Sequence, residues 1–415
     1  MPTPAPHKNP HQTQWEKVKL GDIAEITAGQ SPQSKFYSAT QGMPFLQGSK
    51  TFGFKYPTID TYTTHTTKIA KKGSILISVR APVGDLNFAP FDICIGRGLA
   101  SIEAKVGTNQ SLWYILKFNL ANILRQKNLG TTFDSISKET LQKMNIIAPP
   151  LPTQENIAQI LSTLDKKIEL NTRINTELES MAKLLYTRYF VEFNFPDSSG
   201  KPYKASGGAM VYNPTLKREI PKDWEVAKIG DLCSIQSGFA FSTKDFSSQG
   251  IYKLITIKNV KDGFISIDTD NKILMLPTKL PTFCRLKKGD ILLSLTGNVG
   301  RVGMVWDTDL LLNQRVGIIQ EKEANKSFLY CLFRSEIMKT TLENLASGTS
   351  QHNLSPILTE KLWTLKPKKE ILNKFHNEVS TILESILTNQ QESQRLAEWR
   401  DYLLPLLMGD QVEVV

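Results

Sequence analysis

The sequence predicts an α+β protein made of a duplicated unit, in which a β-rich module with small helices is followed by one long helix. Residues 151–190 contain no glycine, and no proline after Pro152, and their apolar residues recur at helical spacing. Residues 366–408 carry a second apolar stripe that repeats the first at an offset of 218 residues. The segment WEKVKLGDIAEITAG at Trp15 also returns as WEVAKIGDLCSIQSG at Trp224, with seven identities in fifteen positions. The repetition of both parts indicates an internal duplication with pseudo-two-fold symmetry.

Length and composition narrow the class of protein. A chain of 415 residues, with 40% hydrophobic and 22% charged residues, is expected to form two or more soluble domains. Its net charge of +10 favours an anionic partner, most simply nucleic acid, although ribosome-associated and membrane-surface proteins share that balance. The four cysteines form no CxxC pair, and no run of about 18 apolar residues occurs. We therefore expect a reduced, cytoplasmic protein without a membrane span.

Changes in composition, together with the repeats, divide the chain into segments. Residues 1–14 lack an apolar signal core and are expected to form a disordered tail. The expected order is then a first β-rich module (15–150), a central long helix (151–192), a Pro/Gly-rich linker (193–221), a second module (222–365), a distal long helix (366–408) and a C-terminal tail (409–415). Each module should also contain a smaller helix, over residues 111–126 and 327–345.

Three further blocks repeat inside the modules. KKGSILISVRAPVG from Lys71 matches KKGDILLSLTGNVG from Lys287 at an offset of 216, and the runs ILIS and ILLS predict buried strands. GRGLASIEAK is aligned with QRVGIIQEKE at 218, which places Arg97 opposite Arg315. GTTFDSIS and GTSQHNLS repeat a polar Gly-Thr loop, again at 218. The drift of the offset from 209 to 218 predicts short loop insertions between two copies of one scaffold.

The two long helices are predicted to pack through their apolar stripes, because a stripe at this spacing usually marks a core or a coiled coil. The packing positions are Ile157, Leu161, Leu164, Ile168, Leu178 and Leu185 in the central helix, and Phe375, Val379, Ile382, Ile386, Leu396, Trp399 and Leu403 in the distal helix.

Motifs for catalysis are mostly missing. The sequence contains no glycine-rich cofactor loop after a strand, no Walker A loop and no histidines at metal-binding spacing. Asp92, Glu103 and Lys105 do have a spacing at which two carboxylates could hold Mg²⁺ while a lysine stabilises charge, as in a nuclease. The second copy reads Glu321-Lys322-Glu323, so the lysine is absent from the aligned position. A self-contained nuclease is therefore the minor alternative.

The duplicated order of the motifs resembles one family. The central helix follows a Pro-Pro-Leu-Pro turn and a Gln-Glu pair, and a Gly-Thr loop with a polar run precedes each long helix. The segment FNFP (193–196), a glycine-rich linker and the segment IPKDW (220–224) complete the pattern. From Trp15 to Gly409 the chain resembles the specificity subunit of a type I restriction–modification system.

This resemblance implies two target-recognition domains, each reading one half of a bipartite double-stranded DNA target, and two long helices that pair antiparallel as a coiled-coil spacer. It implies no catalytic residue, metal or cofactor in this chain. Modification subunits would bind to it and methylate adenine with S-adenosylmethionine, and restriction subunits that use ATP and Mg²⁺ would join them for cleavage. A helix of about 36 residues would be roughly 54 Å long, longer than the ~34 Å of one duplex turn, which suits a spacer.

Base readout is expected where the two copies diverge, in residues 31–70 and 242–285. Glutamine and asparagine suit adenine edges, whereas lysine and arginine suit guanine or phosphate. The candidates, taken from LQGSK (46–50) and TIKNVKDG (256–263), are Gln47, Ser49, Lys50, Lys258 and Asn259. The repeated glycine turns are those that end at Gly84 and Gly300 in the matched blocks. Arg80 and Arg301 flank these turns and could approach phosphates from there.

Two groups of residues have two interpretations each. Arg97 and Arg315 lie in matched strands, where a structural ion pair is slightly favoured over a DNA contact. The repeated Gly-Thr loop either touches DNA or caps the helix that follows it, and its polar positions are Gln351, His352 and Asn353, set against Thr132, Phe133 and Asp134. For the whole chain, a third hypothesis beside the specificity subunit and the nuclease is a coiled-coil adaptor whose modules do not bind DNA.

Overall fold

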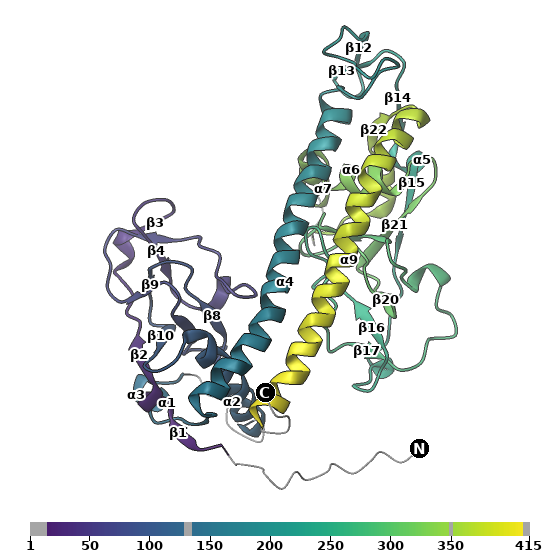
Figure 1. Ribbon diagram of the computed structural model, residues 1–415. Coiled ribbons are helices and arrows are strands. Elements are labelled where there is room, and N and C mark those ends of the chain that lie inside the picture. The colour runs from purple at the N-terminus through teal and green to yellow at the C-terminus, as the bar shows by residue number, and fades with distance from the viewer. Residues whose placement is uncertain (1–14, 128–134, 348–351, 410–415) are drawn as a thin grey trace. The chain divides into compact units, whose positions relative to one another are not determined.

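The computed structural model describes residues 15–127, 135–347 and 352–409 (Figure 1). The chain divides into two compact units: the first contains the described residues up to Lys167 and from Leu396 onward, and the second spans Ile168–Arg395. Each unit is a β-rich module together with segments of two long helices, α4 (Leu151–Tyr186) and α9 (Lys369–Met408). The α+β class and the duplication are thereby confirmed. No helix in the described ranges combines the length and the apolar content needed to cross a membrane.

The first module contains an antiparallel sheet in the order β2-β10-β7-β8 and a mixed sheet in the order β3-β5-β4-β9-β6, in which β4 and β9 are parallel. β1 and β11 form a separate antiparallel pair. The strands are β1 (Lys17–Lys19), β2 (Ala24–Ala28), β3 (Tyr37–Ser38), β4 (Met43–Leu46), β5 (Tyr62–Thr63), β6 (Ile69–Ala70), β7 (Ile75–Ser78), β8 (Leu86–Phe88), β9 (Ile93–Ile95), β10 (Leu99–Ala104) and β11 (Asn145–Ile147). The helices are α1 (Leu20–Ile23), α2 (Asn109–Lys127) and α3 (Lys138–Gln142).

The second module repeats the four-stranded sheet, the parallel strand pair and the separate antiparallel pair of the first. Its antiparallel sheet has the order β15-β21-β18-β19, its second sheet has the order β17-β16-β20 with β16 and β20 parallel, and β14 pairs with β22. The strands of the second unit are β12 (Met210–Asn213), β13 (Arg218–Pro221), β14 (Glu225–Lys228), β15 (Cys233–Ser237), β16 (Tyr252–Ile255), β17 (Lys272–Ile273), β18 (Ile291–Ser294), β19 (Val302–Met304), β20 (Leu310–Leu312), β21 (Val316–Glu321) and β22 (Trp363–Lys366). The helices are α5 (Ile229–Leu232), α6 (Lys326–Phe333), α7 (Glu336–Ser347) and α8 (Pro356–Glu360).

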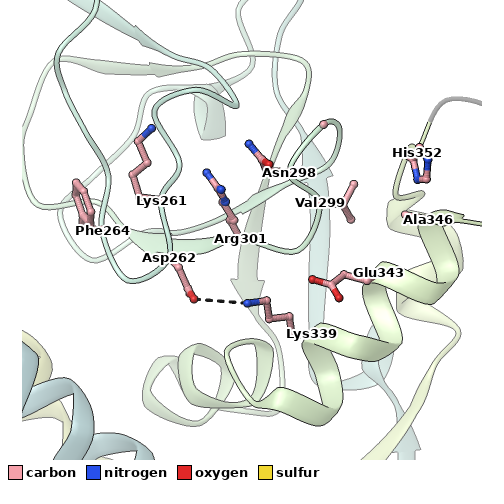
Figure 2. Close-up of a pocket in the computed structure, with 11 residues that line it drawn as sticks. Lys261, Asp262, Phe264, Asn298, Val299, Arg301, Lys339, Glu343, Ala346 and His352 are labelled. Carbon is pink, nitrogen blue, oxygen red and sulfur yellow. Dashed lines mark ion pairs between the residues drawn. The ribbon is translucent and has the colours of Figure 1, made fainter. Parts of the chain in front are cut away.

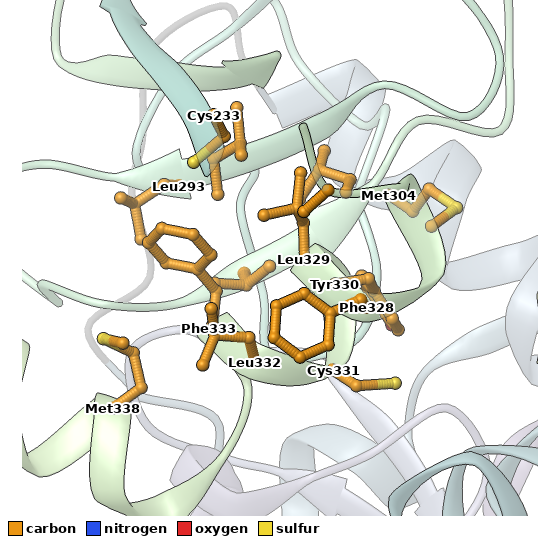
Figure 3. Packing of buried hydrophobic residues seen from close by; sticks show 14 of the residues in the cluster. Cys233, Leu293, Met304, Phe328, Leu329, Tyr330, Cys331, Leu332, Phe333 and Met338 are labelled. Atoms are coloured by element: carbon orange, nitrogen blue, oxygen red, sulfur yellow. The ribbon is translucent and has the colours of Figure 1, made fainter. Parts of the chain in front are cut away.

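The repeated apolar runs form the centres of the modules. β7 and β18, which carry ILIS and ILLS, are buried at all four positions. Helix α6 packs on the sheet of the second module and places Phe328, Leu329 and Phe333 in its core (Figure 3). A continuous apolar run suits a strand that is covered on both faces, so the sequence pattern and the burial agree.

Strand register corrects one part of the sequence alignment. Leu99 pairs with Ser78 in β7, and Val316 pairs with Ser294 in β18, so β10 and β21 correspond at an offset of 217. The counterpart of Arg97 is therefore Gln314, and the prediction that Arg97 matches Arg315 is wrong. Lys105 likewise corresponds to Lys322, and each donates to a carbonyl, Gly21 O at 2.6 Å and Gly230 O at 2.7 Å. The lysine thought to be missing from the second copy is present and has the same structural role.

The long helices run antiparallel within each unit. In the second unit, Asn171 of α4 donates to Glu392 of α9 at 2.7 Å, and Asn389 donates to Asn175 at 2.8 Å. Further along α4 the contacts reach earlier residues of α9. In the first unit, Asp165 of α4 meets Arg400 of α9 at 2.8 Å. Near its start, α4 is stabilised by Gln154, whose side chain donates to the carbonyl of Pro149 at 2.7 Å.

The predicted packing positions of these helices fall into three groups. Buried positions are Ile157, Leu161, Ile168, Phe375, Val379 and Ile386. Half-buried positions are Leu164, Leu178, Leu185, Ile382, Leu396 and Leu403. The prediction for Trp399 is wrong, because this side chain is 67% exposed. A helix with 3.6 residues per turn drifts relative to the counted stripe, and the next residue, Arg400, takes the inward position instead.

Residues 193–221, predicted to be a Pro/Gly-rich linker, contain folded structure. β12 and β13 form a hairpin, and Phe193 and Phe195 are buried. The ring of Phe195 stacks on Trp224 with centroids 5.1 Å apart. Buried aromatic residues therefore anchor this segment to the second module.

Candidate nucleic-acid interface

The first candidate site lies where the parallel strands β4 and β9 end. Gln47 follows β4 directly and is exposed, and its side-chain oxygen accepts a hydrogen bond from Ser31 Oγ at 2.9 Å. Ser31 Oγ in turn accepts from the backbone N–H of Arg97 at 3.1 Å. A Cβ on Gly96 would lie 2.6 Å from Gln47 Oε1 and 3.0 Å from Gln47 Cα, so a side chain at this position would displace the glutamine. The loops after β2, β4 and β9 are therefore joined around one exposed glutamine.

The loop that follows Gln47 is tied to the repeated glycine turn. Ser49 Oγ donates to Asp85 Oδ2 at 3.0 Å, and the backbone N–H of Asp85 donates to Ser78 Oγ at 2.8 Å. Lys50 and Arg80 are exposed beside this connection. Arg80 forms an isolated backbone bridge with Ser135. Lys50 and Arg80 are therefore accessible to an anionic partner, while the hydrogen bonds of Ser49 and Asp85 hold the loop in place.

The second candidate site is the equivalent end of β16 and β20. By strand register, Thr256 occupies the position of Gln47, and Lys258 occupies that of Ser49. Lys258 is exposed. The prediction that Asn259 reads bases is wrong, because this residue is only 4% exposed. Its amide oxygen accepts from Thr256, and its amide nitrogen donates to the carbonyls of Ser266 and Asp268. These hydrogen bonds occupy the Asn259 amide and hold the loop in place.

A cleft of about 620 Å³ lies beside the second site (Figure 2). Arg301 lines it together with Lys261 and Lys339. Lys339 is 4.0 Å from Asp262, so part of this positive charge is compensated within the cleft. The backbone N–H of Arg301 donates to Ser294 Oγ at 3.0 Å. That bond is equivalent to the one from Asp85 to Ser78, and so an arginine in the second module replaces an aspartate in the first.

The Gly-Thr loop can be placed only in part. His352 lines the same cleft, and Asn353 forms a backbone bridge with Thr296 in the glycine turn. This bridge is equivalent to the one between Arg80 and Ser135. Gln351 lies outside the described residues, as do Thr132, Phe133 and Asp134. The described part of the loop is thus attached to the candidate interface.

Asp92 and Lys105, two of the three proposed nuclease residues, are engaged in structural contacts. Asp92 accepts from the Lys72 backbone at 2.9 Å and the Lys71 side chain at 3.0 Å, and these bonds hold the pKa of Asp92 below its ordinary value. Lys105 bonds to a carbonyl, as described above. Among the residues that the structure describes, no cluster of histidine, cysteine, aspartate and glutamate could hold a metal ion.

Arg97 and Arg315 are exposed, and neither forms an ion pair with a described residue. The ion-pair interpretation is therefore not supported. Both follow the end of a parallel strand, beside the candidate sites. Ser31 and Asp85 were missed by the sequence reasoning, although each lies within two residues of a repeated glycine, which could have marked them.

Two equivalent loop clusters, each at the end of a parallel strand pair and each with different exposed polar residues, define a duplicated binding protein. The chain belongs to the family described as the type I restriction modification DNA specificity domain, which it matches over residues 12–180 and 221–362. The resemblance read from the duplicated motifs is confirmed.

Relatives of known name match nearly the whole chain. The chain is 27% identical to the type I restriction enzyme MjaIX specificity subunit of Methanocaldococcus jannaschii, with 96% of this chain and 94% of that protein covered. It is 24% identical to the HindI specificity subunit of Haemophilus influenzae, with 96% and 99% covered. The crystal structure of a type I restriction–modification S subunit from M. genitalium has a TM-score of 0.57 and 16% identity over 97% of this chain and 98% of that chain. This structural similarity supports the fold.

Proposed function

We propose that this chain is the DNA specificity subunit of a type I restriction–modification complex and that its two modules read the two halves of a bipartite DNA target. The observation that carries the proposal is that one topology presents different residues at equivalent strand ends, Gln47 in one module and Thr256 in the other. Two modules that share one scaffold but differ in their loop residues are suited to recognise different DNA sequences. The net charge of +10 suits a polyanionic partner.

The chemistry belongs to partner subunits in this proposal. Modification subunits would bind S-adenosylmethionine and methylate adenine, and restriction subunits would use ATP and Mg²⁺. The specificity subunit itself is non-catalytic and holds no metal or cofactor. The four cysteines are free and buried, which suits a protein that works in the reducing cytoplasm.

An exposed apolar stripe on α4 is our candidate surface for the modification subunits. It consists of Leu170, Ile174, Met181 and Leu184, which are 39–68% exposed and recur at helical spacing on one flank of the helix. Such a stripe marks a protein interface more often than a solvated face. We expect Leu184→Asp to weaken binding of the modification subunit by at least about tenfold, which corresponds to about 1.4 kcal/mol. Ile357→Asp, at an exposed apolar residue of α8, is the matched control and should leave binding unchanged.

Reconstitution tests the whole proposal. The purified chain alone should neither methylate nor cut duplex DNA. Addition of the modification subunit and S-adenosylmethionine should produce methylated adenine only within bipartite sites, and binding of the complex should weaken steeply with salt. Methylation or cleavage by the chain alone, or methylation without sequence preference by the complex, would overturn the proposal.

A further inference from the structure

A tyrosine recurs in α2 and α6, the equivalent helices of the two modules, outside the motifs used above. NQSLWYIL (109–116) and NKSFLYCL (325–332) match at an offset of 216, which makes Tyr114 and Tyr330 equivalent. Both tyrosines are almost completely buried. Tyr114 donates to Asp165 at 2.6 Å and Tyr330 donates to Glu179 at 2.6 Å. Both acceptors belong to the long helix α4. Each module therefore forms a hydrogen bond to that helix through the equivalent tyrosine.

An arginine completes each of these contacts. Arg400 of α9 pairs with Asp165 at 2.8 Å, and both side chains are less than a tenth exposed. Arg334, in the short break between α6 and α7, pairs with Glu179, and these side chains are 21% and 23% exposed. A carboxylate that accepts from a tyrosine and from an arginine has a fixed position, because both bonds restrict its rotamer.

Each arginine also contacts the loop that carries the readout candidates of its own unit, which we call the recognition loop: residues 47–57 in the first unit and 256–265 in the second. The guanidinium of Arg400 lies over the ring of Phe54, 5.5 Å from its centroid. Arg334 Nε is 3.4 Å from Asp262 Oδ1. Phe54 and Asp262 occupy neighbouring positions of the repeat, because the strands that precede them correspond at an offset of 209. Two different sequences thus bring an arginine to the same place in both modules.

The turn in the second module is packed closely against its arginine. Gly263 has φ +92°, and a Cβ on this residue would lie 3.0 Å from Arg334 Nη2. Tyr330 Oη is also 3.4 Å from the Gly263 carbonyl oxygen. Glycine satisfies both demands, the positive φ and the small space. The backbone of this loop is therefore held against a side chain that is itself fixed by α4.

We propose that Arg334 and Arg400 are positioning residues for base readout. Each arginine holds one recognition loop against α4 through the α4 carboxylate with which it pairs, Glu179 or Asp165. This inference rests on the proposed function. Readout requires that loop groups such as Gln47 and Lys258 be placed to within about half an ångström. A loop without such a support loses more conformational entropy when it binds DNA, and it discriminates less between bases. We call Glu179, Tyr330, Arg334 and Asp262 the second brace, and Asp165, Tyr114, Arg400 and Phe54 the first brace.

The test uses the complex assembled with modification subunits and duplexes that carry one base change in one half-site at a time. Arg334→Gln should lower base discrimination about tenfold in a single half-site, since one good base contact contributes about 1–3 kcal/mol. The affected half-site should be the one altered by Lys258→Ala. Arg334→Lys keeps the charge and should recover part of the discrimination. Phe54→Ala, which removes the exposed loop-side partner of Arg400 and leaves the buried ion pair intact, should affect the other half-site.

Lys183→Gln is the matched control. Lys183 of α4 pairs with Glu336 of α7 at 3.0 Å, so it also joins the helix to the second module, but it does not contact the recognition loop. Both side chains are well exposed, and the pair contributes little to stability. Discrimination should be unchanged in both half-sites.

A double-mutant cycle separates the brace from a general loss of structure. Asp262→Asn removes the charge on the loop side, at a residue whose side chain is 56% exposed, and leaves the Glu179 pair intact. If the arginine acts through this loop, the effects of Asp262→Asn and Arg334→Gln on discrimination will be non-additive. Additive effects would overturn the proposal, as would an equal loss of affinity for all sequences or a change in both half-sites. If the wild-type complex itself fails to discriminate bases, the proposed function is wrong and the brace is not the cause.

Discussion

Removal of Arg400 should destabilise the first unit strongly. Arg400 and Asp165 are 8% and 9% exposed and lie 2.8 Å apart. Arg400→Met would leave the Asp165 carboxylate buried, with Tyr114 as its remaining hydrogen-bond donor among the described residues. Breaking a buried ion pair on one side costs about 3–5 kcal/mol. For a domain of this size that corresponds to a fall in Tm of roughly 6–20 °C. Trp399→Ala, at the exposed neighbour, should shift stability by less than about 0.5 kcal/mol.

Thermal melting followed by circular dichroism would measure this loss, and hydrogen exchange would localise it to the first unit. The triple variant Tyr114→Phe, Asp165→Leu, Arg400→Met replaces these three side chains by apolar ones and should regain most of the stability, because neither charge of the buried ion pair is left behind. A variant Arg400→Met that melts like the wild type would refute this reasoning. So would a loss spread equally over both units.

Three further predictions concern single residues. Asn259→Ala should lower the free energy of unfolding, measured by denaturant titration, by about 2–3 kcal/mol, because it leaves several buried loop groups without partners. Lys258→Ala, in contrast, should weaken DNA binding and leave the free energy of unfolding unchanged. Arg301→Gln should weaken binding equally for all DNA sequences and reduce the slope of log affinity against log salt by about 1. The exposed Lys222, which lies outside both the cleft and residues 242–285, is the control, and Lys222→Gln should change neither quantity. Burial and the charge of Asp165 raise the pKa of Tyr114. Above pH about 10 the unfolded chain therefore binds fewer protons than the folded chain. Stability should then fall as pH rises, and this fall should be shallower in Tyr114→Phe.

The repeated blocks were sufficient to predict the duplicated modules and the two long helices. They succeeded because the buried strands and turns of both copies face the same packing demands, as β7 and β18 show. The alignment failed where identities are few: Arg97 and Arg315 are matched by letter, whereas the hydrogen-bond register pairs Arg97 with Gln314. Asparagine in a polar loop does not reveal its burial, and so the structural role of Asn259 could not be read from its neighbours in sequence.

The two braces were also beyond prediction from the sequence. Asp165 and Arg400 are 235 residues apart, and no local pattern connects them. The repeated tyrosine was visible in both copies, but its acceptors differ, aspartate in one unit and glutamate in the other. Contacts of this kind become visible only once the long helices are paired, because their partners come from different turns of α4.

Mapping methylated adenines in cells that carry the chain with its modification subunit tests the central claim most directly. The wild type should give one bipartite motif with a single spacing. Gln47→Ala should change the bases of one half only, and Lys258→Ala those of the other half only, with the spacing unchanged in both variants. A contiguous motif in the wild type, or a change in both halves caused by either substitution, would contradict the claim that each module reads its own half-site.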